Sequence, residues 1–369
     1  MNKKNFAAAM AAIIVTFGAV TVCANRRDPT AVKHADKDVS SYAVSAADDS
    51  TSDEEDTSSL LSPLLADTSS QVLDEVVVNE EVEEAVEERA TESFNVSGNY
   101  GFTSSGFDTV YSNEEMQKCF DRLQEICNDS NFPLAFSYKN INTGAYIGYH
   151  QYDSYMTCSC VKAPYVKSIL EDDIDLDKKI VLNEKWDGDD GTLSAKDYGT
   201  EYTAKELIEY TILESDNTAY QLLCRNFGTQ SFNNMQYSLG SNYTLGYNGE
   251  WIFTYCTSDD MMKDYEDIYY FTEKNKHGIW LKNLMCNCKL NIQIGQALGK
   301  KYPVAQKYGT DFIERAFNDC AVVYADSPFV LCIFTSQVPE TEESCQVFKD
   351  IALVCDDINS LIADNGKSE

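Results

Sequence analysis

A serine and a lysine three positions apart, Ser159 and Lys162, are the residues of this sequence with the clearest chemical potential. They lie where a short polar turn runs into an apolar segment that spans residues 161–170. If Ser159 opens a helix, Lys162 follows one turn later on the same face. A neutral lysine amine at that position can take the proton of the serine hydroxyl. The pair therefore predicts an activated nucleophile that needs no histidine.

Two further polar motifs follow in the chain. Ser-Asp-Asn at 215–217 joins two segments with helical patterns. Lys-Tyr-Gly-Thr at 307–310 lies in the first of three segments with strand patterns. The Lys-x-Gly pattern also occurs at Lys276, but that copy precedes a helical segment, so its context favours the later copy at Lys307. Each motif alone is also compatible with an ordinary structural role, such as a helix cap or a surface lysine.

The elements that must position these motifs can be predicted from apolar periodicity. Helices are expected to begin near Ser112 and at Thr203, another helix is expected at 217–227, and an amphipathic helix is expected at 348–362. Strands are expected at 134–139, 145–149, 303–307, 319–325 and 329–336. This order predicts an α/β (α+β) fold in which a five-stranded antiparallel sheet is flanked by N- and C-terminal helices. An all-helical domain is inserted between the second and third strands.

From about residue 113 to residue 363 the chain resembles the class A β-lactamase and penicillin-recognising serine hydrolase family. The resemblance rests on S-x-x-K at Ser159, S-D-N at Ser215 and K-x-G at Lys307, which occur in the family's order. It extends to the segments 134–162, 202–228 and 304–337 around these motifs. The resemblance implies a β-lactamase/transpeptidase-like fold and an enzyme that cleaves a strained cyclic amide.

The resemblance also implies a role for each motif residue. Ser159 would be acylated, Lys162 would act as the base, and Ser215 would relay a proton to the leaving nitrogen. Lys307 would attract the substrate carboxylate, and backbone N–H groups of Ser159 and Thr310 would form an oxyanion hole. The implied catalytic residues are Ser159, Lys162, Ser215 and Glu250. The implied substrate-binding residues are Asn217, Lys307, Gly309 and Thr310.

Two positions depart from the family pattern. Tyr308 replaces a small hydroxyl residue, and strand alternation predicts that its side chain points away from the cleft. Glu250 is the only acid in the loop 240–256, where the family carries the glutamate that hydrolyses the acyl-enzyme. It lies closer to the following helix cap, Thr257, than the family pattern has it. Whether Glu250 performs this step is left open by the sequence.

Three functions remain open on these grounds. The first is a β-lactamase, and the second is a D,D-peptidase-like hydrolase of peptidoglycan stem peptides. The third is a catalytically inactive cell-surface binding domain. The cysteines at 158 and 160 flank the nucleophile, and we expect them to be buried small residues without a chemical role.

Charge and composition indicate how the rest of the 369-residue chain is organised and which partners it can bind. The net charge of −31 argues against nucleic-acid binding, which needs clustered lysine and arginine. Residues 1–24 have the pattern of a signal peptide or an N-terminal membrane anchor, with Cys23 as an alternative lipidation site. Residues 25–112 are expected to be an acidic disordered tether, because 48–92 contain sixteen acids and one base. The hydrolase domain is then predicted at 113–369.

These features predict an extracytoplasmic protein, either secreted or tethered to the cell surface. We expect a monomer whose partner is a small β-lactam or a peptidoglycan peptide, and which meets a membrane only through an N-terminal anchor. None of the 13 cysteines forms a C-x2-C pair and the three histidines are scattered. The sequence therefore predicts no metal and no cofactor, and it leaves disulfide pairing open.

Overall fold

The computed structural model describes residues 101–107, 114–187, 191–246, 251–291, 293–337 and 341–365. They belong to one compact unit that spans residues 88–369. The predicted signal or anchor at 1–24 lies outside the described residues, as does most of the predicted tether at 25–112. No helix within the described ranges is long and apolar enough to cross a bilayer.

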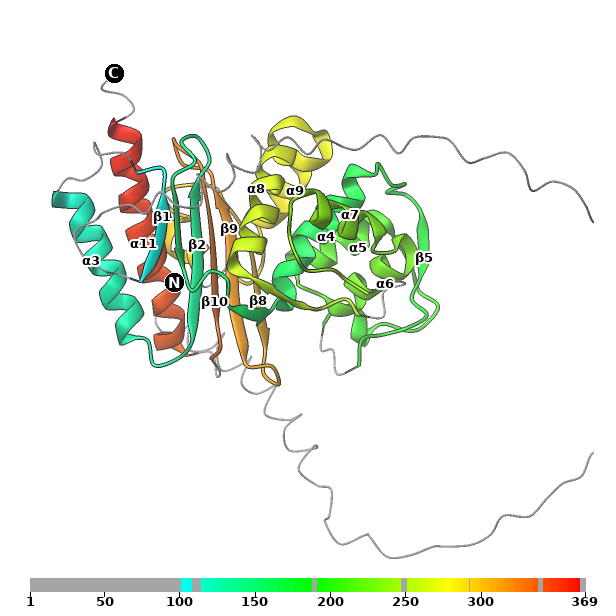
Figure 1. Ribbon diagram of the computed structural model, residues 1–369. Helices are drawn as coiled ribbons and strands as arrows, with labels where there is room; N and C mark the ends of the chain where they lie inside the picture. Colours follow the sequence, from blue (N-terminus) through cyan, green and yellow to red (C-terminus); the bar gives the residue numbers. More distant parts are fainter. Residues whose placement is uncertain are drawn as a thin grey trace, which may run out of the picture. The chain divides into compact units, whose positions relative to one another are not determined.

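The fold is built on a six-stranded antiparallel sheet with the order β1-β3-β2-β10-β9-β8 (Figure 1). Five of its strands come from the segments predicted as strands. Their bounds are β2 Leu134–Asn140, β3 Tyr146–Tyr149, β8 Val304–Asp311, β9 Ala316–Val323 and β10 Phe329–Thr335. β8 extends four residues beyond its predicted end, so the motif residues from Lys307 to Thr310 all lie on this strand. Because β8 ends the order, one edge of the motif strand is not covered by another strand of this sheet.

The predicted count of five strands is wrong, because the sheet has a sixth strand, β1 Phe102–Ser105. This strand lies within the stretch 25–112 that was predicted to be tether, and it pairs with β3. Its anchor is Phe102, whose ring centroid lies 5.2 Å from that of Tyr149 and 6.0 Å from that of Phe136. Four residues with one large apolar side chain give no strand periodicity, so the sequence pattern could not reveal β1.

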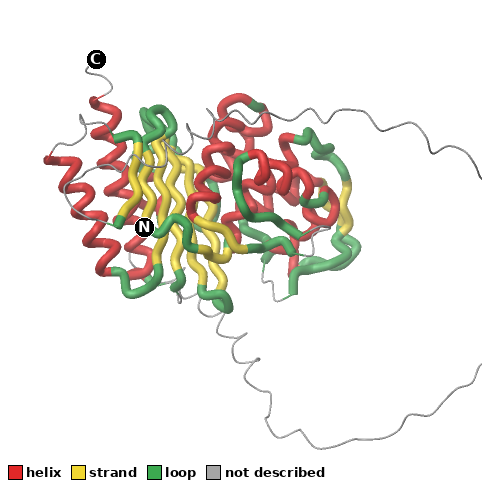
Figure 2. Tube along the Cα trace, in the orientation of Figure 1, coloured by secondary structure: helices red, strands yellow, loops and turns green. Residues whose placement is uncertain are grey.

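Two hydrophobic layers cover the two faces of the sheet, as Figure 2 shows by the helices on either side of the strands. On one face β-strand side chains pack with the helices from the two ends of the domain and with a short helix before β8. These are α3 Glu114–Asp129, α10 Ile294–Leu298 and α11 Glu342–Asn365. The arrangement matches the predicted N- and C-terminal flanking helices.

The other face packs against the predicted helical insertion. Its helices are α4 Lys162–Glu171, α5 Ala204–Leu213, α6 Asn217–Phe227, α7 Gln230–Ser238, α8 Ser258–Lys274 and α9 Lys276–Cys286. Two small ladders join its loops, β5 Lys179–Val181 with β6 Glu201–Thr203, and β4 Ser154–Met156 with β7 Tyr255–Thr257. The second ladder fixes the loop before α8 to the segment that leads into Ser159.

Candidate active site

Ser159 lies in a tight turn, the 3₁₀ helix η2 Cys158–Val161, which continues directly into α4. Cys158 has φ 46°, a left-handed conformation that is unfavourable for a residue with a Cβ. Its neighbours Thr157 and Cys160 are buried, whereas Ser159 is partly exposed. Strained backbone of this kind persists where the surrounding structure holds it, and it is frequent at active sites. The turn thus presents the serine of a buried segment at the surface.

Lys162 is buried at the first position of α4, and its ammonium group meets the second motif. Nζ donates to the backbone oxygen of Ser215 at 2.5 Å and to Oδ1 of Asn217 at 2.6 Å. Ser215 Oγ lies 3.3 Å from the same nitrogen. Residues more than fifty positions apart in the sequence are therefore joined by hydrogen bonds around one amine.

The conformation of the second motif explains how Ser215 reaches this amine. Ser215 has φ 60°, again in the left-handed region, and it stands between α5 and α6. Asp216 holds the turn, because its buried carboxylate accepts from the N–H of Ala219 in α6 and from the N–H of Leu193, each at 2.8 Å. Asp216 is thus the N-cap of α6, and the motif's first and third residues are left to face Lys162.

Lys307 approaches Ser215 from the sheet. It is buried on β8, and its Nζ donates to Ser215 Oγ at 2.9 Å and to the backbone oxygen of Tyr308 at 2.9 Å. Burial lowers the pKa of the Lys307 amine from its ordinary value. Ser215 Oγ thus has an amine donor on both sides. Its own hydrogen is then available for a third partner.

Gly309 brings β8 against η2, the turn that contains Ser159. A Cβ at this position would lie 2.5 Å from the backbone nitrogen of Ser159 and 2.8 Å from Cβ of Cys158. Only glycine permits this approach. The next residue, Thr310, donates its hydroxyl hydrogen to the backbone oxygen of Ala316 at 3.2 Å. The Thr310 hydroxyl therefore has its lone pairs, not its hydrogen, left for a ligand.

Tyr308 points to the opposite face of β8, as strand alternation predicts. Its ring lies in the hydrophobic layer on the other side of the sheet, 5.8 Å from the ring of Phe317. Phe317 in turn packs on Phe348 of α11 at 4.8 Å. The large residue in the third motif thus fills the core behind the strand and leaves the opposite face, which meets Ser215, to Lys307.

The two cysteines beside Ser159 are buried, as predicted. Burial raises the pKa of both the Cys158 and the Cys160 thiols well above the ordinary value, so both stay protonated near neutral pH. The Cys160 thiol donates to the backbone oxygen of Lys307 at 3.2 Å. A protonated thiol is a poor nucleophile. The twelve cysteines in the described part of the chain are all free thiols.

Seven of the eight predicted site residues are thus gathered where η2, α6 and β8 meet. The segment 118–358, which contains these residues and more than half of the chain, matches the model of the family described as "Beta-lactamase enzyme family". The chain belongs to this β-lactamase family. None of the curated proteins compared with the sequence matches it.

Solved structures of low sequence identity share the fold of this β-lactamase family member. One is PBP-A, with 18% sequence identity and a TM-score of 0.55; the match covers 64% of this chain and 93% of the PBP-A chain. A PBP-A mutant that matches over the same shares of the two chains is described as an acyl-enzyme complex with penicillin G. Another is the β-lactamase from Sphaerobacter thermophilus, with 20% sequence identity and a TM-score of 0.55; the match covers 64% of this chain and 94% of the other. A third is an ancestral class A β-lactamase of Gram-negative bacteria, with 20% sequence identity and a TM-score of 0.56; the match covers 63% of this chain and 97% of the other.

Two aromatic residues that the sequence reasoning missed lie beside Lys162. Its Nζ is 5.7 Å from the ring centroid of Tyr220 and 5.8 Å from that of Phe253. Tyr220 follows Asn217 by three residues on α6, so helical spacing could have placed both on one face. Phe253 lies in a loop, where no periodic pattern indicates what a side chain contacts.

Glu250, the eighth predicted residue, lies outside the described residues. The loop segments on both sides of it are firmly attached. Asn233 of α7 exchanges two hydrogen bonds with the backbone of Leu245, each at 2.9 Å. The Gly246 N–H donates to the backbone oxygen of Trp251 at 2.8 Å. The described residues on either side of the gap at 247–250 are thus held by hydrogen bonds.

A buried carboxyl group also anchors this loop. Tyr243 of the loop donates its hydroxyl to Asp264 of α8, and Gln236 Nε2 donates to the same carboxyl group at 2.6 Å. Burial is the main reason that the pKa of Asp264 is raised to about 8. The protonated carboxyl is thus the form that the folded protein favours over most of the physiological range.

This anchor predicts a pH-dependent stability difference. The pKa of Asp264 is higher in the folded than in the unfolded chain, so its contribution to stability is present at low pH and is lost as the pH rises from about 4 to about 8. Asp264→Asn keeps the shape but cannot ionise. Relative to the parent, the variant should gain stability with rising pH, on the order of 1.4 kcal/mol per pH unit at most. Thermal melts of both proteins across that range would measure it; a constant difference would contradict it.

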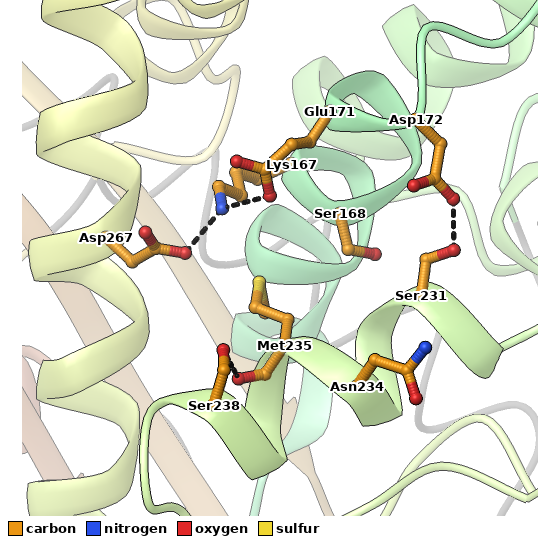
Figure 3. Close-up of a pocket in the computed structure, with 9 residues that line it drawn as sticks. All are labelled: Lys167, Ser168, Glu171, Asp172, Ser231, Asn234, Met235, Ser238 and Asp267. Carbon is orange, nitrogen blue, oxygen red and sulfur yellow. Dashed lines mark hydrogen bonds and ion pairs between the residues drawn. The ribbon is translucent and has the colours of Figure 1, made fainter.

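A separate cavity of about 340 Å³ lies at the C-terminal end of α4, between α4, α7 and α8 (Figure 3). It contains none of the predicted site residues. Its buried lysine, Lys167, pairs with Glu171 at 2.6 Å and with Asp267 at 2.5 Å. Within the described ranges no three His, Cys, Asp or Glu side chains are grouped so that they could hold a metal ion.

Proposed function

We propose that this β-lactamase family member is a serine hydrolase that is acylated at Ser159 by the strained amide of a β-lactam. The main support for the proposal is the convergence of Lys162 and Lys307 on Ser215 Oγ, in the same site as the partly exposed Ser159. Two amines, one hydroxyl and one amide oxygen form a connected path for protons. Such a path has no evident structural purpose, because buried lysines are costly to place in a core.

In the proposed acylation step, Ser159 Oγ attacks the substrate carbonyl while its proton passes to a neutral Lys162. Backbone N–H groups of Ser159 and Thr310 receive the developing oxyanion. Ser215 then gives its free hydrogen to the leaving nitrogen and is resupplied by the lysine amines. Lys307 attracts the carboxylate that β-lactams carry, and Asn217 aligns the substrate amide and Lys162.

We propose that Glu250 activates the water that releases the acyl group. Support comes from the loop that follows it: Ile252 accepts a hydrogen bond from Tyr220 at 2.9 Å, and Phe253 contacts Lys162. The described residues that directly follow position 250 in the sequence therefore contact the site.

Glu250→Gln should therefore accumulate the acyl-enzyme, because glutamine cannot accept a proton from water. Acylation should proceed at nearly the parental rate, while release should slow by about a hundredfold or more. Mass spectrometry of the protein at intervals after mixing with penicillin G would follow both steps. An unchanged release rate would exclude Glu250 as the base and would support a different route for water.

A second function, a D,D-peptidase-like hydrolase of peptidoglycan stem peptides, is favoured by one observation. The aromatic ring of Phe253, in the described loop segment 251–254, occupies space beside Lys162. An apolar ring there leaves less room for a hydrolytic water than a polar side chain would. The TM-score with PBP-A, 0.55, is close to those with the two β-lactamases, 0.55 and 0.56, so the fold alone favours neither function.

Stopped-flow measurement with a chromogenic cephalosporin separates the two functions. Steady turnover supports the β-lactamase, whereas a single burst equal to the enzyme concentration supports the peptidase-like protein. The absence of both would overturn the proposal of a serine hydrolase. The export pattern at 1–24 supports an extracytoplasmic location, where either substrate would be met.

A further inference from the structure

The ammonium group of Lys162 is enclosed by groups that favour positive charge. The ring centroids of Tyr220 and Phe253 lie 5.7 Å and 5.8 Å from Nζ, within the range of a cation–π contact. The two rings also contact each other, with centroids 5.6 Å apart and planes inclined by 57°. The backbone oxygen of Ser215 and the amide oxygen of Asn217 can only accept hydrogen bonds.

Two influences act against the positive charge. Lys162 is fully buried, which disfavours any ion, and Lys307 places a second amine on the far side of Ser215 Oγ. The nearby titratable groups of the adjoining elements are the thiols of Cys158 in η2 and Cys224 in α6, which burial keeps neutral, and the buried carboxylate of Asp216 at the start of α6. The described groups that favour the cation are therefore the two rings, the two oxygens and this carboxylate.

We propose that Tyr220 and Phe253 are positioning residues that hold Lys162 as an ammonium ion in the resting enzyme and thereby set the pH above which it can take the proton of Ser159. This inference rests on the proposed acylation of Ser159, whose base must be neutral. The face of an aromatic ring attracts a cation through its quadrupole, and this attraction is lost when the amine is neutral. The rings thus oppose the form of Lys162 that reacts.

Phe253 is the ring that can be varied with least disturbance. It is partly exposed and lies in a loop, whereas Tyr220 is fully buried in α6 and donates its hydroxyl to Ile252. Phe253 also meets the ring of Trp186 edge to face, at 5.3 Å and 86°. Fluorination withdraws charge from the face of the ring and leaves its size almost unchanged, so it tests the quadrupole without creating a cavity.

The test incorporates mono-, di- and trifluorinated phenylalanine at position 253 in the full chain. Lysine labelled with carbon-13 at Cε reports the protonation of Lys162 directly by NMR, with the signal assigned by its loss in Lys162→Met. Each step of fluorination should lower the pH midpoint of Lys162, with a total of roughly half a pH unit, or threefold in the neutral fraction. Acylation by penicillin G should shift to lower pH in parallel.

Two controls separate the ring face from other effects. The same fluorination at Phe232 of α7, whose ring is not one of the two described beside Lys162, should leave the midpoint unmoved. The fluorinated series is repeated in Glu250→Gln, because that acid precedes Phe253 by three residues; the same shift is expected there. A midpoint that is constant across the series overturns the inference.

The NMR titration needs no substrate, so it decides the inference even if penicillin G does not acylate the protein. Absence of acylation would instead overturn the proposed function. A shift in the NMR titration without a matching shift in the acylation profile would show that Lys162 is not the base, and would overturn the role assigned to the rings.

Discussion

Replacing Lys162 with methionine is expected to slow the acylation of Ser159 by about a thousandfold or more. Methionine fills similar space but offers no amine, so the proton of Ser159 loses its acceptor. The backbone oxygen of Ser215 and the amide oxygen of Asn217 also lose their buried donor, which should reduce the free energy of unfolding by about 1–3 kcal/mol. Acylation is measured by mass spectrometry with penicillin G, and stability by denaturant titration.

Lys167→Met is the matched control for this variant. Lys167 is also buried on α4, but its two partners, Glu171 and Asp267, belong to the separate cavity in Figure 3. Its loss should reduce stability, because Asp267 keeps a partly buried charge without its partner. Acylation should stay within a fewfold of the parental rate. Equal losses of acylation in both variants would show that any buried amine on α4 matters only for folding.

Gly309→Ala is expected to produce the second large effect. The added Cβ would meet the backbone nitrogen of Ser159 at 2.5 Å, a distance at which β8 and η2 must move apart. A displacement of about 1 Å in the reacting group costs roughly a hundredfold in rate. The acylation rate with penicillin G should fall by at least that factor, while the sheet stays folded because β8 keeps its pairing with β9.

Tyr308→Phe serves as the control on the same strand. Its ring packs behind the sheet against Phe317, and the substitution keeps that ring. Acylation should be nearly unchanged, and the far-ultraviolet circular dichroism of both variants should match the parent. An active Gly309→Ala enzyme would contradict the role assigned to this close contact.

Many of the helices and strands could be predicted from local patterns in the sequence. The segments that became β2, β9 and β10 are long and apolar, and α6 begins with an aspartate cap. Strand alternation placed Tyr308 and Lys307 on opposite faces of β8. The three polar motifs were found by their order and context, and the structure brings their residues together.

Other features depended on tertiary contacts that no local pattern encodes. β1 is held by the packing of Phe102 on distant rings, not by its own periodicity. The left-handed conformations of Cys158 and Ser215 occur at residues that seldom adopt them, so sequence gives no signal of either. The contact of Phe253 with Lys162 joins a loop to a helix, and only the folded chain shows it.

Acylation of Ser159 can be tested by intact-protein mass spectrometry after incubation with penicillin G, followed by peptide mapping. We expect one added penicilloyl group per chain, located on the peptide that contains Ser159, and none in Ser159→Ala. An adduct on another residue, an adduct that survives in Ser159→Ala, or an unmodified parent protein at saturating penicillin G would contradict it.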